Sequence, residues 1–142
     1  MDVVFLDANV LFSAAYRPDA GSRELWELPD VELVTSDYAL AEARRNIGDR
    51  QQLNDLDNLL QRVRVIGLTR LERPLPPGLK LPDKDRPIFL SAIDARATHL
   101  LSGDGKTFGA YFGQRVEGIA ILLPGDYLIN IMGSDLNLRM RC

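Results

Sequence analysis

The stretch from residue 81 to residue 108 places acidic side chains at both ends of one predicted helix–strand unit. Asp83 and Asp85 precede a helix opened by a proline, and an aspartate at this point can cap the free N–H groups. Asp104 comes just after residues 99–102, which predict a short buried strand. In open α/β sheets, ligands gather at the carboxyl ends of the strands. This unit is therefore a candidate half of a metal site.

Another acid follows the first predicted strand. Residues 3–6 form an unbroken apolar run, typical of a parallel strand buried on both faces, and Asp7 comes directly after it. Asp7 could simply cap the next helix. A carboxylate directly after a fully buried strand has a functional role more often than one on a surface helix, because its desolvation requires a compensating partner. Asn9 could cap the same helix or hydrogen-bond Asp7.

Glu42 is the remaining candidate acid. Ser36 or Asp37 opens a predicted helix that places Glu42 about a turn and a half from its start. The alanines around Glu42 would let another element approach closely. Taken alone, Glu42 is better explained as an exposed carboxylate paired with Arg45 or Asn46, so its assignment depends on the other acids.

Convergence of these carboxylates in one cleft would be tolerable with a divalent cation, or with a proton on one of them. Oxygen ligands favour hard cations, so the residue types indicate Mg²⁺ or Mn²⁺. The only histidine is His99 and the only cysteine is Cys142, which leaves no thiolate-rich zinc site. Mg²⁺ takes its remaining ligands from water and substrate phosphate, and metal-assisted hydrolysis of a phosphodiester follows from that chemistry.

Composition sets the broad class. The 142 residues suffice for one domain, and we expect a single domain over residues 1–142. With 17 basic and 20 acidic residues, the chain does not bind nucleic acid by bulk charge. A single cysteine permits no internal disulfide, and neither a membrane-spanning run nor a signal peptide is visible. A soluble cytoplasmic protein is the expectation.

Strands and helices are predicted in alternation, with several unbroken apolar strands. This order predicts an α/β protein: a three-layer α/β/α sandwich with a mainly parallel central sheet. The predicted strands span residues 3–6, 31–35, 63–66, 99–102 and 118–123; the predicted helices span residues 22–28, 36–47, 49–63, 87–97 and 127–132. Residues 68–82, rich in proline, are predicted to be an irregular connector, and residues 105–113 a loop.

Several segments, in the right order and over nearly the whole chain, resemble the PIN-domain family, including its VapC-type toxins. They read VVFLDANVLFSA, ALAEARRNI, LPDKDRPIFLSAIDARATHLLSGDGKTFG and GIAILLPGDYL. Each motif is weak alone, but their order, spacing and α/β context are fairly specific together. The resemblance implies a PIN-like three-layer fold.

Carried over by position, the resemblance implies the catalytic and metal-binding acids Asp7, Glu42, Asp85 and Asp104. It also implies supporting roles for Asn9, Asp83 and Ser102. The sequence departs from the pattern at residues 105–107, where many members carry a further acid and this chain has Gly-Lys-Thr. The missing acid argues against a second metal ion at the site, and not necessarily against the first.

PIN domains are typically Mg²⁺- or Mn²⁺-dependent ribonucleases, and many are toxins of toxin–antitoxin pairs that form homodimers. The resemblance thus implies an endoribonuclease with an RNA substrate, an antitoxin partner and a homodimeric state. Basic residues near the acids are candidates to bind RNA phosphates, although exposed arginines are usually only solvated: Arg44, Arg45, Lys84, Arg86 and Lys106.

Other classes of protein explain the sequence less well. A catalytically inactive PIN-fold interaction module is the main alternative, and intact acids at all the family positions argue against it. A haloacid-dehalogenase-like phosphatase would require a second aspartate at position 9, where this chain has Asn9. A response-regulator-like receiver would require paired acids at the end of the first strand, where Asp7 stands alone after Leu6.

Overall fold

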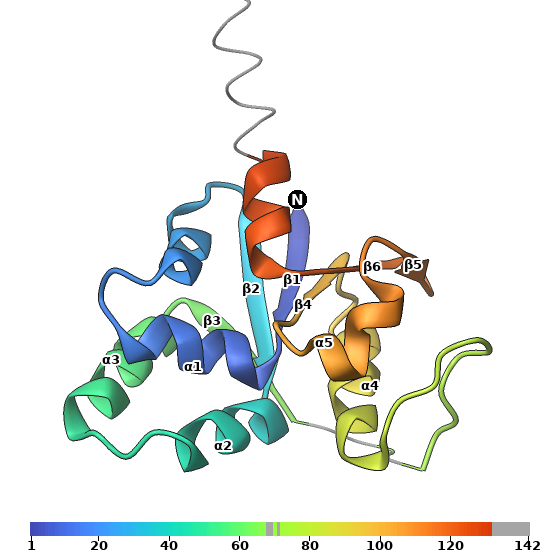
Figure 1. Ribbon diagram of the computed structural model, residues 1–142, viewed down its shortest axis with the longest axis horizontal. Helices are drawn as coiled ribbons and strands as arrows, with labels where there is room; N and C mark the ends of the chain where they lie inside the picture. The colour runs from blue at the N-terminus through green and yellow to red at the C-terminus, as the bar shows by residue number, and fades with distance from the viewer. Residues whose placement is uncertain (68–69, 71, 132–142) are drawn as a thin grey trace, which may run out of the picture.

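A mainly parallel sheet forms the centre of the molecule (Figure 1). The structure is a computed structural model, and it describes residues 1–67, 70 and 72–131. The strand order is β3-β2-β1-β4-β6-β5, in which only the β5–β6 pair is antiparallel. The strands are β1 (Asp2–Leu6), β2 (Val31–Ser36), β3 (Val63–Ile66), β4 (His99–Leu101), β5 (Arg115–Val116) and β6 (Ile119–Leu122).

Helices cover the sheet in the three-layer α/β/α arrangement predicted from the sequence. Helix α1 packs on both α2 and α3, while α4 packs against β2 and β4. The helices are α1 (Ala8–Tyr16), α2 (Asp37–Arg45), α3 (Arg50–Leu60), α4 (Arg86–Asp94), α5 (Gly105–Phe108) and a helix over residues 124–131. Short 3-10 turns are η1 (Gly21–Glu27), η2 (Asp83–Asp85) and η3 (Gly109–Tyr111).

The core lies where β1 and β4 pair at the centre of the sheet. Phe5 pairs with Leu100 and Leu6 with Leu101, and all these side chains are fully buried. Phe89 of α4 is buried in the same core. The N–H group of Asp7 donates to the Leu101 carbonyl (3.0 Å), which extends the pairing one residue beyond β1. This pairing fixes the relative position of the segments that follow both strands.

Local differences from the sequence prediction have identifiable causes. The segment around Trp26 forms the 3-10 turn η1 instead of an α-helix, and it ends just before Pro29. Residues 105–113, predicted to be a loop, contain α5 and η3 because Asp104 caps the first of these. The antiparallel strand β5 was missed, since two residues give no periodic signal.

Other boundaries move by a few residues. Helix α4 begins at Arg86 and ends at Asp94, and a helix covers residues 124–131. Residues 68, 69 and 71 of the connector, Met132 of the predicted last helix, and Cys142 lie outside the described residues. Within the described part, no helix has the length and apolar character required to cross a membrane.

Candidate active site

Asp7 stands at the point where β1 gives way to α1. Its backbone is extended, and its Oδ1 accepts a hydrogen bond from the Ala8 N–H (2.7 Å), so Asp7 is the N-cap of α1. Its Oδ2 accepts hydrogen bonds from the Ser102 hydroxyl (2.8 Å) and from the Asn9 amide (3.2 Å). The helix-cap interpretation of Asp7 is therefore correct, and the same carboxylate also faces a cavity.

Asn9 and Ser102 join the ends of β1 and β4. The Asn9 side-chain amide also donates to Ser102 Oγ (3.3 Å), and its Oδ1 accepts the Gly103 N–H (2.7 Å). Gly103 lies so close to this amide that an added Cβ would stand 3.3 Å from Asn9 Oδ1. Ser102 Oγ in turn accepts the Asp104 N–H (3.0 Å). Asp7 and Asp104 are thus linked through one buried hydroxyl.

Asp104 caps the short helix α5. Its Oδ1 accepts hydrogen bonds from the N–H groups of Lys106 and Thr107, both at 3.1 Å. The pKa of Asp104 lies below its ordinary value: burial acts to raise it, but hydrogen bonds from Thr107 and Lys106 lower it by more. The positive charge of Lys84 lowers it further. Asp104 is therefore held as a carboxylate at neutral pH.

Asp85 ends the turn η2 and is buried. Its Oδ2 accepts a hydrogen bond from the Thr107 hydroxyl (3.1 Å). The turn is also fastened from α2, because the Tyr38 hydroxyl donates to the Lys84 carbonyl (2.6 Å). These bonds connect the segment that carries Asp85 to two other elements of the site.

Glu42 lies on α2, whose N-terminus is capped by the Ser36 hydroxyl (3.1 Å to the Ala39 N–H). Tyr38 is four residues earlier, on the same face of the helix. Burial raises the pKa of Tyr38, and the negative charges of Glu42 and Asp85 raise it further, which places all three near one another. The side chain of Glu42 is half-buried.

One cavity of about 250 Å³ brings the predicted acids together. It is large enough for a cation with several waters, each occupying about 30 Å³. Its lining residues are Asp7, Ala8, Asn9, Phe12, Glu42, Asn46, Lys84, Asp85 and Asp104. A second cavity, of about 630 Å³, also borders Asn9 but is lined mainly by apolar side chains, and it holds none of the acids that the resemblance implies.

The smaller cavity suits a hard cation, since four acidic residues, whose carboxylate oxygens such a cation prefers, line one space. In the described part of the chain, no three His, Cys, Asp or Glu side chains stand close enough together to hold a metal ion as they are arranged. One oxygen of Asp104 and one oxygen of Asp85 accept hydrogen bonds from protein donors. The carboxylates would therefore hold a cation partly through bridging waters.

Burial raises the pKa of Asp7 from 3.8 to about 6. Hydrogen bonds from Ser102 and Ala8 oppose this shift, while the charges of Glu42 and Asp85 add to it. The carboxylate of Asp7 is thus costly to ionise without a positive partner. A divalent cation in the cavity would supply that partner.

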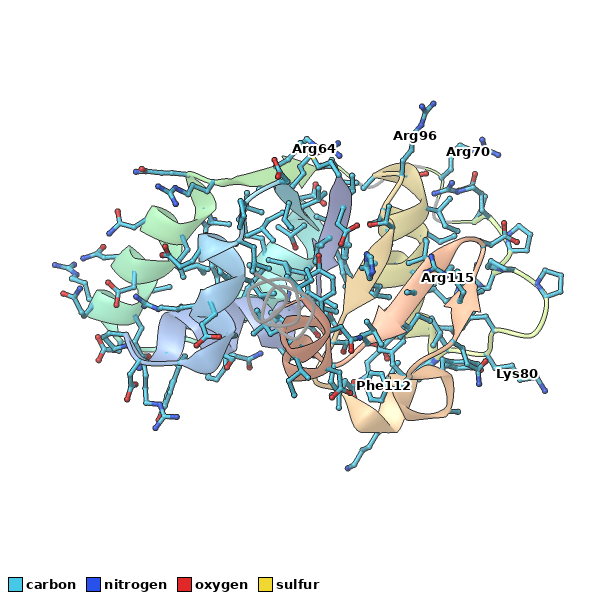
Figure 2. All side chains as sticks on the ribbon, turned by 90° about the horizontal axis from the view of Figure 1, so that it is seen from above. Arg64, Arg70, Lys80, Arg96, Phe112 and Arg115 are labelled. Atoms are coloured by element: carbon cyan, nitrogen blue, oxygen red, sulfur yellow. The ribbon has the colours of Figure 1, made fainter. Side chains whose placement is uncertain are left out.

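Among the predicted supporting and basic residues, only Asn9 and Lys84 line this cavity. Ser102 does not line the cavity but donates a hydrogen bond to Asp7, whereas Asp83 and Arg86 line a different hollow. Arg44 pairs with Asp57 on the surface (3.0 Å), and Arg45 and Lys106 are exposed. Figure 2 shows three other arginines, Arg64, Arg70 and Arg96, along one edge of the molecule, and none of them lines the cavity.

Three contributors were missed from the sequence. Asn46 lines the cavity, Tyr38 fastens η2, and Thr107 donates to Asp85. The spacing of Tyr38 and Glu42 on one helix face was an available signal. Nothing in the sequence pattern pointed to the Thr107 hydrogen bond, because it joins residues 22 positions apart.

We expect Ser102→Ala to raise the pKa of Asp7 above about 6, because the Ser102 hydroxyl hydrogen-bonds the charged form. The lost bond and the orphaned Asp104 N–H should also cost about 1–3 kcal/mol of folding stability. An NMR titration of the Asp7 carboxyl carbon measures the pKa. Ser13→Ala is the matched control, because the Ser13 hydroxyl is exposed. An Asp7 pKa equal to or below the parent's would contradict this.

No protein-family model and no curated protein sequence matches this chain. Solved structures do match in fold. The VapBC2 structure from Rickettsia felis, bound to a DNA fragment from their promoter, has 20% identity and a TM-score of 0.60 over 84% of this chain and 96% of that one. Mycobacterium tuberculosis VapC20, described as a Sarcin-Ricin loop cleaving toxin, has 19% identity and a TM-score of 0.51, with coverages of 75% and 94%.

VapBC-1 from nontypeable Haemophilus influenzae has 18% identity and a TM-score of 0.53, covering 87% of this chain and 98% of that one. These likenesses span nearly the full length of each solved chain. The protein therefore has a PIN/VapC-like fold, as the sequence resemblance predicted.

Proposed function

We propose that this protein is a Mg²⁺- or Mn²⁺-dependent endoribonuclease that hydrolyses RNA phosphodiester bonds. The observation that carries the proposal is the cavity at the carboxyl edge of β1 and β4, where Asp7, Glu42, Asp85 and Asp104 face one space. Acids at the carboxyl ends of parallel strands are in the usual place for a ligand site of this class of fold. The fold likeness to a toxin described as Sarcin-Ricin loop cleaving supports the choice of substrate class.

Asp7, Asp85 and Asp104 would hold the cation, directly or through water, and Glu42 would orient the attacking water or a further ion. When bound, the cation polarises the phosphoryl oxygen and lowers the pKa of its water. Asn9 and Ser102 keep the Asp7 carboxylate in place through their hydrogen bonds. Lys84, at the wall of the cavity, can meet a substrate phosphate.

The proposal includes a protein partner. Two of the similar structures are named VapBC, and the family resemblance implies a toxin with its antitoxin in a homodimeric assembly. An antitoxin would be expected to cover the acidic cavity and so prevent RNA from entering. Light scattering of the purified chain would measure its oligomeric state.

Cleavage of labelled RNA tests the activity. We expect the full chain to cut RNA with Mg²⁺ or Mn²⁺, to lose cutting completely in EDTA, and to regain it when Mn²⁺ is restored in excess. Both structured and unstructured RNAs should be tested as substrates, since the fold does not indicate which of them is cut. The matched control substrate is DNA of the same sequence.

Cutting that persists in EDTA would contradict the metal role. Absence of cutting on every RNA, together with no heat on Mn²⁺ titration, would contradict the enzyme and favour the inactive interaction module.

A further inference from the structure

Thr107 makes hydrogen bonds to two acids that belong to different elements. Its backbone N–H donates to Asp104 Oδ1 (3.1 Å), and its hydroxyl donates to Asp85 Oδ2 (3.1 Å). Asp104 follows β4, whereas Asp85 ends η2, and the hydroxyl bond crosses 22 residues of sequence. A single half-buried residue thus links two walls of the acidic cavity.

We propose that Thr107 is a positioning residue, which fixes the Asp85 carboxylate relative to Asp104 and thereby sets the affinity of the site for a divalent cation. The inference rests on the proposed function and adds a residue to it. Thr107 is not one of the acids proposed to hold the cation; it acts through the Asp85 and Asp104 carboxylates that it bonds.

The two hydrogen bonds select which carboxylate oxygens remain for a cation. Asp85 makes no side-chain capping bond to α4, so its orientation is not fixed by its own helix. The Thr107 hydroxyl occupies Oδ2 of Asp85, and the backbone amides occupy Oδ1 of Asp104. The other oxygen of each carboxylate is the one that can face the cavity. Hydrogen bonds from outside the ligand shell orient metal ligands in this way in many sites.

A hydroxyl at this place adds a hydrogen bond without adding charge. The cavity already concentrates carboxylates, and the charges of Glu42 and Asp85 make the Asp7 carboxylate harder to ionise. A further acid within residues 105–107 would increase that repulsion. Thr107 therefore orders the site at a lower electrostatic cost than an acid would.

Calorimetric titration of the full chain with Mn²⁺ tests this inference. Thr107→Val keeps the shape of the side chain and removes the hydroxyl, and we expect Mn²⁺ affinity to fall about 10–100-fold. Thr107→Ser keeps the hydroxyl and should retain the parent's affinity. RNA cleavage by Thr107→Val should also need more Mn²⁺ for half-maximal rate and recover when Mn²⁺ is saturating.

Thr98→Val is the matched control for losing a threonine hydroxyl. The Thr98 hydroxyl donates to the Val3 carbonyl (3.0 Å) at the opposite end of β1, away from the cavity. This variant should lower the melting temperature and leave Mn²⁺ affinity unchanged. Circular dichroism would confirm that each variant is folded.

Equal Mn²⁺ affinity of the parent and Thr107→Val, or an equal loss in Thr107→Val and Thr107→Ser, would overturn the role of Thr107 and leave the proposed function standing. A parent that binds no Mn²⁺ would overturn both.

Discussion

Asp7→Asn is expected to abolish RNA cleavage, with a loss of at least about 10³-fold. A bound cation supplies several kcal/mol of transition-state stabilisation, and each 1.36 kcal/mol is tenfold in rate. Asp7 accepts hydrogen bonds from Ala8, Asn9 and Ser102, and asparagine has nearly the same shape but no charge. Single-turnover cleavage with saturating Mn²⁺ measures the loss. Asp19→Asn, on an exposed turn, is the matched control and should cut as the parent does.

The same variant should be as stable as the parent or more stable. A raised pKa means that the folded state favours the protonated acid, so the stability from Asp7 is full below pH 3.8 and is lost as the pH rises through about 6. The shift of roughly two pKa units sets an upper limit of about 3 kcal/mol. Without metal, Asp7→Asn should therefore melt at the same or a higher temperature at pH 7, and any advantage should vanish below about pH 4.

Thermal unfolding in EDTA, measured from pH 4 to pH 8, checks the sign of this effect. A variant that cuts RNA as well as the parent would contradict the assignment of Asp7 as a ligand. A variant markedly less stable at pH 7 would contradict the electrostatic explanation.

Phe89→Ala is the second substitution with a large expected effect. Phe89 is fully buried in α4, the helix that begins directly after Asp85. Removing its ring leaves a cavity in the core, and such changes cost about 3–5 kcal/mol. That is a large part of the stability of an ordinary domain, typically about 5–15 kcal/mol. Urea unfolding followed by circular dichroism measures the cost.

Phe89→Leu is the control for this prediction, because leucine refills part of the space. It should be clearly more stable than Phe89→Ala and retain RNA cleavage. Equal free energies of unfolding for Phe89→Ala and the parent would mean that burial of the Phe89 ring does not stabilise the fold.

The sheet and its bordering acids were predictable because the signals are local. The unbroken apolar run before Asp7 and the short segment around Leu100 and Leu101 before Asp104 predicted buried strands, and the carboxyl ends of neighbouring parallel strands must lie together. The resemblance then supplied Glu42 and Asp85, whose positions alone were ambiguous. The structure places all these acids on one cavity, while their roles remain predictions.

The missed features depend on contacts between distant residues. The resemblance favoured Asp85 over Asp83 as a ligand, and Asp85 lines the cavity; Asp83, predicted to support the site, instead lines a separate hollow with Tyr38 and Arg86. The turn η2 decides between them, and its orientation comes from bonds to α2 and α5. The surface pairing of Arg44 with Asp57 likewise joins residues 13 positions apart, and the role of Arg44 toward RNA phosphate stays a prediction.

The hydrogen bond from the Ser102 hydroxyl to the Asp7 carboxylate joins residues 95 positions apart, and it requires that β4 pair with β1. Contacts so distant in sequence form late, since a long loop must close before they are made. A chain still emerging from the ribosome has its first acid long before its last. Assembly of the acidic cavity, and with it the proposed cutting of RNA, would therefore wait until the segment that carries Asp104 has joined the sheet.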